Sequence, residues 1–176
     1  FKETSKNNDK NLPLRTELLD IALNLEHHIN LVLLTYLSIE TEERKALTNK
    51  SGNLSFKNKI DLLFDLEILS KEEHKLFLLL MEFRNQFLHN IDCNSFTDAV
   101  AILGKDKENG LLKFDDVKFN CDLEFRYNNA YKSLFLKSIQ ITREKIRKRK
   151  QTIEEKAQIL NSQSQQLVYL TDSFFG

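Results

Sequence analysis

Glycine and proline are scarce in this sequence, with four glycines and one proline among 176 residues. A β-sandwich or barrel joins many short strands by tight turns and would normally use more of both. Leucine, isoleucine, lysine and glutamate dominate instead, and these residues are compatible with long helices. The composition therefore predicts an all-α protein.

The sequence also lacks an excess of either charge, because 26 basic residues balance 26 acidic ones. A general affinity for polyanions is not implied, so a nucleic-acid site would have to be a local patch. Cys93 and Cys121 lie far apart without a C-x-x-C motif, which favours free thiols in a reducing compartment. No apolar run reaches the roughly 18–20 residues that span a bilayer, and no signal peptide is evident. We therefore expect a cytoplasmic protein without a membrane partner.

Apolar residues recur at helical spacing in four main segments. The first runs from Pro13 to about Leu47, and the second covers Phe56–Leu69. The third helix follows a capping box formed by Ser70 and Glu73, and the fourth begins near Asp122. Since most connections are short, we expect antiparallel neighbours in an up-and-down bundle of four main helices with additional short ones.

Shorter segments complete the predicted organisation. A short helix is expected at Phe96–Leu103, ended by Gly104, and a loop that could include a small hairpin is expected over residues 105–120. The C-terminal segment stays helix-compatible and carries sparse apolar residues, so it could pack on a partner or fray. The chain thus divides into a disordered lead-in (1–11), a helical bundle (12–150) and a helical extension (151–176).

The third helix ends in a polar cluster of Arg84, Asn85, His89 and Asn90. Asn85 and His89 are four residues apart and lie on nearly the same face, and Arg84 has the reach to join them. A guanidinium can hold a phosphate through two hydrogen bonds, and an imidazole can exchange a proton near neutral pH. The cluster would suit metal-independent RNA cleavage, in which His89 moves a proton and Arg84 stabilises the charge on phosphorus.

From the residues alone, a structural interpretation of this cluster is favoured over a catalytic one. Arg84 could pair with Glu26 on the first helix, and His89 could stabilise the helix end through the helix dipole. Structural ion pairs also create such clusters. Adjacent His27 and His28 point about 100° apart on a helix, without a matching cysteine or histidine pair, so we expect neither a metal nor another cofactor.

A second candidate feature is the basic segment 143–150, which holds six cations and one acid. Arg143, Arg147 and Lys148 could grip a phosphate backbone as part of an RNA-binding surface. The alternative is a solvated helical face whose cations pair with acids one turn later along the same helix.

The hexapeptide Arg84–His89 (RNQFLH) resembles the R-N-x-x-x-H form of the R-x(4–6)-H motif of HEPN domains. This resemblance implies an all-helical bundle that forms a homodimer and brings two motifs together. It further implies a metal-independent endoribonuclease with RNA as substrate. Such proteins are often toxins with an antitoxin partner or parts of phage-defence systems.

A second resemblance covers residues 54–104, which are similar to the mannitol operon repressor family, itself HEPN-like. The shared pattern is a helix, a turn, the Arg-x(4)-His helix and a short following segment. This sequence has Leu66 and Glu67 where a glycine would be more usual. The resemblance implies a non-catalytic regulator or interaction module with a regulatory protein partner.

Overall fold

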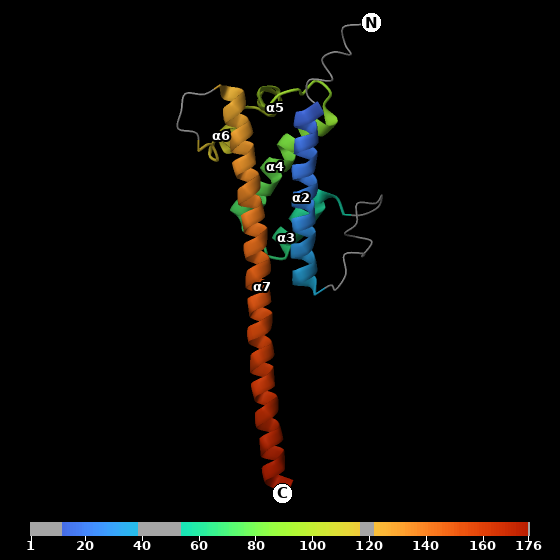
Figure 1. Cartoon of the computed structure of the whole chain (residues 1–176), viewed down its shortest axis with the longest axis vertical. Helices are drawn as coiled ribbons and strands as arrows, with labels where there is room; N and C mark the ends of the chain where they lie inside the picture. Colours follow the sequence, from blue (N-terminus) through green and yellow to red (C-terminus); the bar gives the residue numbers. More distant parts are fainter. Residues whose placement is uncertain (1–11, 39–53, 117–121, 176) are drawn as a thin grey trace.

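The computed structural model describes residues 12–38, 54–116 and 122–175 (Figure 1). Over these residues the chain is helical and contains no strand, so the predicted all-α class is confirmed. The predicted disordered lead-in (1–11) and Cys121 lie outside the described residues. The helices are α2 (Leu12–Leu37), α3 (Phe56–Asp65), α4 (Lys71–His89), α5 (Phe96–Leu103), α6 (Lys105–Leu112) and α7 (Leu123–Phe175).

Local capping chemistry fixes the start of three helices. At α4, the Glu73 N–H donates to Ser70 Oγ at 3.2 Å and the Ser70 N–H donates to the Glu73 carboxylate at 2.7 Å, which completes the predicted capping box. Ser55 and Ser95 cap α3 and α5 through a single bond each, in which the serine hydroxyl accepts from the backbone N–H three residues later. Gly104 ends α5 with φ of 87°, a conformation that favours glycine.

Several predicted boundaries were wrong. Residues 105–112 form helix α6 rather than a loop. The α6 start has no side-chain cap, so the sequence gives no local signal there. Burial of Leu111 and close packing of Gly110, where a Cβ would lie 3.3 Å from a Leu79 methyl group, position this helix instead. Helix α2 ends at Leu37 rather than near Leu47, and α3 ends at Asp65 rather than at Leu69.

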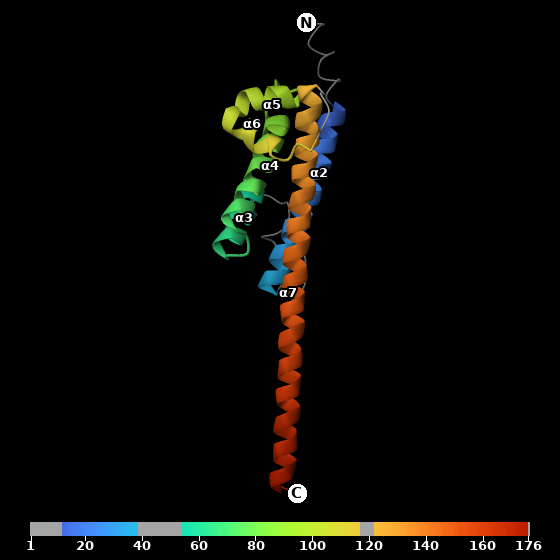
Figure 2. The ribbon, with the colours of Figure 1, turned by 90° about the vertical axis from the view of Figure 1, so that its left-hand side faces the viewer.

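The helices pack in two layers (Figure 2). Helices α2 and α7 lie side by side in one layer, and α3 to α6 lie on one side of that pair. The core between the layers is mostly aliphatic and contains a cluster of aromatic rings with centroids 4.9–6.5 Å apart. The clustered rings are fully buried, and they belong to Phe83, Phe87, Phe96 and Tyr131.

Neighbouring helices do not simply alternate in direction. Glu17 pairs with Lys132 near the starts of α2 and α7, and the Tyr36 hydroxyl donates to the Lys145 carbonyl near the end of α2. These two contacts show that α2 and α7 run in the same direction. Helix α4 runs against both, because Glu73 at its start pairs with Lys145 and Asn90 after its end contacts Arg15 near the start of α2. The arrangement therefore differs from a simple antiparallel up-and-down bundle. Short connections force antiparallel neighbours, and the connection between α2 and α3 is long.

Helix α7 is far longer than the bundle and protrudes from it as a single helix (Figures 1 and 2). Side chains from Ile153 to Leu170 are all exposed. We call residues 151–175 the extension; at 1.5 Å per residue it is about 37 Å long. Among the described helices, none has the length and apolar character to cross a membrane.

Candidate functional site

Arg84 and Asn85 are adjacent on α4 and are tied to one another. The Arg84 Nη1 group donates a hydrogen bond to Asn85 Oδ1 at 3.0 Å, and both side chains are partly buried. Arg84 also lines a pocket of about 20 Å³ between α2, α3 and α4, beside Glu26 and Phe56. A water molecule needs about 10–15 Å³, so this pocket has room for one water and is too small for a phosphate group.

Glu26 has a different partner from the one predicted. Its carboxylate accepts a hydrogen bond from Lys59 Nζ at 2.7 Å, and the Lys59 side chain is completely buried. Glu26 thus neutralises a cation from α3 rather than pairing with Arg84. Sequence reasoning missed Lys59 because nothing local distinguishes a lysine that folding buries from one that stays in water.

His89 is exposed at the last position of α4. Among the described residues it makes no hydrogen bond and no ion pair. His89 lies about 40° from Asn85 around the helix but about 140° from Arg84. The helix therefore keeps Asn85 and His89 on one face, while Arg84 lines the pocket beside Glu26.

Asn90 contributes to the turn that follows α4. Its Oδ1 accepts the Asp92 N–H at 3.0 Å, and its carbonyl accepts from Arg15 Nη2 at 3.2 Å. The same Arg15 nitrogen lies 3.2 Å from the carbonyls of Ile91 and Cys93. Arg15 thus holds the turn next to His89, a role that sequence reasoning missed because the contact spans about 75 residues of chain.

Tyr131 lies in the core near this cluster. Its hydroxyl is buried and has no hydrogen-bond partner among the residues that the structure describes. Burial raises the pKa of Tyr131 far above its usual value, although the positive charge of Arg84 partly opposes that shift. The phenol therefore stays protonated at neutral pH and cannot act as a base beside Arg84.

The basic segment lies at the other end of α4. Lys145 pairs with Glu73 in the first turn of α4, whereas His89 is its last residue, so the two regions are about 24 Å apart along the helix. Arg143 and Arg147 are exposed and line a groove of about 370 Å³ between α2 and α7. Lys148 lines a separate groove beside Tyr36. The fold of one chain does not bring these cations to His89.

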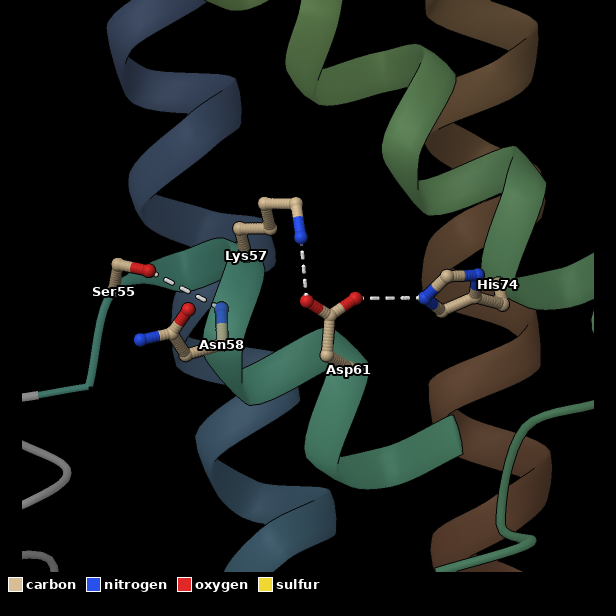
Figure 3. Close-up of polar contacts among 5 residues, drawn as sticks. All are labelled: Ser55, Lys57, Asn58, Asp61 and His74. Atoms are coloured by element: carbon tan, nitrogen blue, oxygen red, sulfur yellow. Dashed lines mark hydrogen bonds and ion pairs between the residues drawn. The ribbon is translucent and has the colours of Figure 1, made fainter. Parts of the chain in front are cut away.

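An aspartate–histidine pair connects α3 to α4 (Figure 3). Asp61 receives hydrogen bonds from Lys57 Nζ at 2.6 Å and from His74 Nε2 at 2.9 Å, and the two hydrogen bonds lower the pKa of the Asp61 carboxyl. The ring of Phe64 lies 4.6 Å from that of His74. Figure 3 shows the Asp61 carboxylate between the Lys57 ammonium group and the His74 ring. The Asp61–His74 pair holds α3 against α4. Of the two interactions of Asp61, only the one with Lys57, at i,i+4 spacing, could be predicted from the sequence.

The extension exposes seven large apolar residues, and three of them recur at a regular interval. Ile153, Leu160 and Leu167 are seven residues apart and are 44%, 65% and 65% exposed, whereas the other four lie off this line: Ile159, Val168, Tyr169 and Leu170. We call Ile153, Leu160 and Leu167 the extension stripe. The interval was present in the sequence, but the sparseness of apolar residues there obscured it.

Comparisons with protein-family models, curated proteins and solved structures find no match for this chain. Within the described ranges, no three His, Cys, Asp or Glu side chains gather closely enough to hold a metal ion. The candidate sites therefore rest on their own geometry: a polar cluster at the end of α4 and an apolar stripe on the extension.

Proposed function

We propose that this chain is a non-catalytic protein-interaction module that binds its partner through the extension. The observation that carries the proposal is the exposed extension stripe. Most helices in proteins are stabilised by packing an apolar face on another element, and a seam between two helices carries apolar residues at two positions of every seven, of which the extension stripe supplies one. The side chains of the extension from Ile153 to Leu170 are exposed.

The geometry of the polar cluster agrees with a non-catalytic role. Arg84 lies beside a pocket too small for a phosphate and is bonded to Asn85, and His89 lies on another side of α4. The resemblance to the mannitol operon repressor family points the same way, because it implies a regulator with a protein partner. A toxin that binds an antitoxin could likewise use the extension stripe.

A matched pair of variants tests the interaction role. The stripe variant carries glutamate at all three positions of the extension stripe. The control variant places the same three charges on the opposite face, as Gln151→Glu, Gln158→Glu and Gln165→Glu. Native mass spectrometry of the purified chains should show a stoichiometric partner, whether another protein or a second copy, with the wild type and the control. The stripe variant should lose it, and equal retention by all three chains would refute the proposal.

Metal-independent RNA cleavage is a second candidate function. Its support is the exposed imidazole of His89 with Asn85 on nearly the same face, together with the resemblance to HEPN domains. That resemblance implies a homodimer in which two motifs complete one site. For this function the Arg84 side chain would swing out of its pocket and stabilise the charge on phosphorus. Arg143, Arg147 and Lys148 would bind the RNA backbone.

Incubation of the chain with a panel of structured RNAs in EDTA tests the second function. His89→Ala should abolish cleavage, as should Arg84→Ala. His27→Ala, which removes an equally exposed histidine from α2, should leave it unchanged. Absence of cleavage by the wild type would exclude the nuclease, as would cleavage that survives both motif substitutions.

A further inference from the structure

We infer that the groove between α2 and α7 is a docking site for an acidic amphipathic helix of another protein. The groove lies on the bundle, so this inference goes beyond the interaction role proposed for the extension and stands on other residues. Three observations carry it: the apolar floor of the groove, two arginines at one end that pair with no described residue, and the spacing of those arginines.

The floor of the groove is apolar and faces away from the bundle core. The groove has a volume of about 370 Å³ and is lined by Phe135, Leu136 and Ile139 of α7, with Asn24 of α2 on the other wall. Leu136 follows the fully buried Leu134 by two residues, so at 100° per residue it lies on the opposite side of α7. Leu136 is 65% exposed, and together with its two apolar neighbours it gives a partner a continuous apolar surface.

Two arginines continue the groove towards the end of the bundle. Arg143 and Arg147 line it and are exposed, and neither makes an ion pair or hydrogen bond with a described residue. Other cations of the same segment are already bound within the bundle. Lys145 pairs with Glu73, and the Arg149 guanidinium donates to a backbone carbonyl in the last turn of α2. The fold therefore leaves the two cations on the groove side available to a partner.

The charge of the groove favours an acidic partner. The one acid among the lining residues is Glu144, whose carboxylate accepts a hydrogen bond from Gln140 at 3.1 Å. Two arginines against one glutamate leave the groove a net charge of +1. A carboxylate brought to either arginine gains a charge-assisted hydrogen bond, whereas a basic partner would be repelled.

The spacing of the arginines matches that of acids on a helix. Arg143 and Arg147 are four residues apart, which separates their Cα atoms by about 6 Å along the axis of α7. Acids four residues apart on a partner helix laid along the groove have the same separation, and a guanidinium can bind a carboxylate through two hydrogen bonds. Leu136 lies about 16 Å from Arg147 along α7, so three turns of a partner helix reach from the apolar floor to both arginines.

An acidic amphipathic helix fits the groove better than a nucleic-acid backbone does. A sugar–phosphate backbone would neutralise the arginines but has no apolar side chain to place on the floor. A helix with apolar residues beside its acids covers both parts of the groove at once. Three turns about 10 Å wide cover roughly 160 Å² of this chain, so we expect a weak, reversible complex with a dissociation constant of about 100 µM.

An NMR titration of the ¹⁵N-labelled full chain locates the docking site. The probe is a synthetic helix of about 18 residues with leucines on one face and glutamates four residues apart beside them. Its matched control has glutamine at every glutamate position. The glutamate helix should shift the amide signals of residues 135–147, and the glutamine helix should bind at least about fivefold more weakly. The inference is overturned if these signals stay in place up to about 1 mM helix, or if the two helices bind equally.

Two charge-matched double variants test the arginines. Arg143→Gln with Arg147→Gln should weaken binding of the glutamate helix at least about fivefold. Lys137→Gln with Lys156→Gln removes the same charge from exposed positions outside the groove and should change binding less than about twofold. Leu136→Ser should weaken binding as well. All five positions are exposed, so each variant should keep the circular dichroism spectrum of the wild type. Equal effects of the two double variants overturn the inference.

Two further outcomes separate this inference from the functions proposed above. If the glutamate helix shifts residues 153–170 instead, and loses binding in the stripe variant, the groove inference is overturned while the interaction role is supported. Unchanged binding to the stripe variant supports the groove whatever the outcome for the extension. If a single-stranded RNA of about 12 nucleotides shifts the groove signals at lower concentration than the helix does, the groove binds nucleic acid and the inference is overturned.

Discussion

Leu134 and Leu160 lie on the same helix in opposite surroundings. Leu134 is fully buried in the bundle, whereas Leu160 is 65% exposed on the extension. The helix is continuous between them, so helical conformation persists where bundle packing has ended. The difference separates two roles of one apolar residue type: in the bundle leucine stabilises the fold, and on the extension it is available to a partner.

The largest expected difference in stability is between truncation of Leu134 and truncation of Leu160. Leu134→Ala should lower the free energy of unfolding by roughly 2–5 kcal/mol, because it removes buried methyl groups and leaves a cavity. Leu160→Ala should change it by less than about 0.5 kcal/mol in dilute monomer, where its side chain meets water in both states. Urea unfolding at low protein concentration compares them, and equal losses would contradict the division of α7 into two functional halves.

The buried ion pair of the bundle should rank next. Glu26→Gln removes the carboxylate bound to fully buried Lys59, and breaking a buried pair costs about 3–5 kcal/mol. Because 17% of the Glu26 side chain is exposed, we expect about 2–3 kcal/mol. Glu17→Gln, which breaks the exposed pair with Lys132, should cost at most about 1 kcal/mol. Chemical denaturation measures the free energy of unfolding of both variants, and equal losses would contradict the view that burial makes the Glu26–Lys59 pair stronger.

Helix capping gives a smaller contrast. Ser70→Ala removes the capping box of α4 and should cost about 1 kcal/mol. Ser162→Ala removes a serine whose hydroxyl only donates to the Ile159 carbonyl one turn earlier on the extension, and should cost almost nothing. Thermal unfolding monitored by circular dichroism should show a lower Tm for the first variant alone.

One exposed substitution should stabilise the bundle. Glu67 has φ of 57°, in the left-handed region that glycine adopts most easily. Glu67→Gly should therefore raise the free energy of unfolding by about 0.5–1 kcal/mol. Lys137→Gly, in an exposed helical position of α7, should lower it by about 1 kcal/mol. Urea midpoints that move in the same direction for both variants would contradict this interpretation of Glu67.

The smallest effect concerns pH. Hydrogen bonds from Lys57 and His74 lower the pKa of Asp61 in the folded chain, so its contribution to stability is present above the unfolded pKa and is lost as pH falls through the folded one. Asp61→Asn should cost a few tenths of a kcal/mol at pH 7, since the pair is partly exposed. The difference between variant and wild type in urea unfolding should shrink as the pH falls below the ordinary carboxyl pKa, because the Asp61 carboxylate then becomes protonated in the folded chain as well. A constant difference across the range would exclude this linkage.

Signals for the fold that depend on nearby residues were readable from the sequence. Ser55, Ser70 and Ser95 each start a helix because capping involves only the next three residues. Helix α6 was missed because its position depends on the burial of Leu111. The shared direction of α2 and α7 was missed as well, since loop length alone constrains direction weakly when a connection is long.

At the candidate sites, too, features set by nearby residues could be predicted, and contacts between distant residues could not. Helical spacing correctly places Asn85 and His89 on one face of α4. It could not show that Glu26 binds Lys59 or that Arg15 holds the turn after α4, because both contacts join distant parts of the chain. The extension stripe was present as a period of seven, yet only the exposure of those residues reveals that the bundle does not use them.

Helix α7 runs unbroken out of the bundle. Because the bundle ends near residue 150, a partner bound at Leu160 is held roughly 15 Å beyond it, at a distance that the stiff helix keeps nearly constant. His89 lies at the opposite end of the bundle, so contact with the extension stripe alone leaves the Arg84–His89 motif uncovered. A nuclease that needs two such motifs would have to bring its bundles together through another surface.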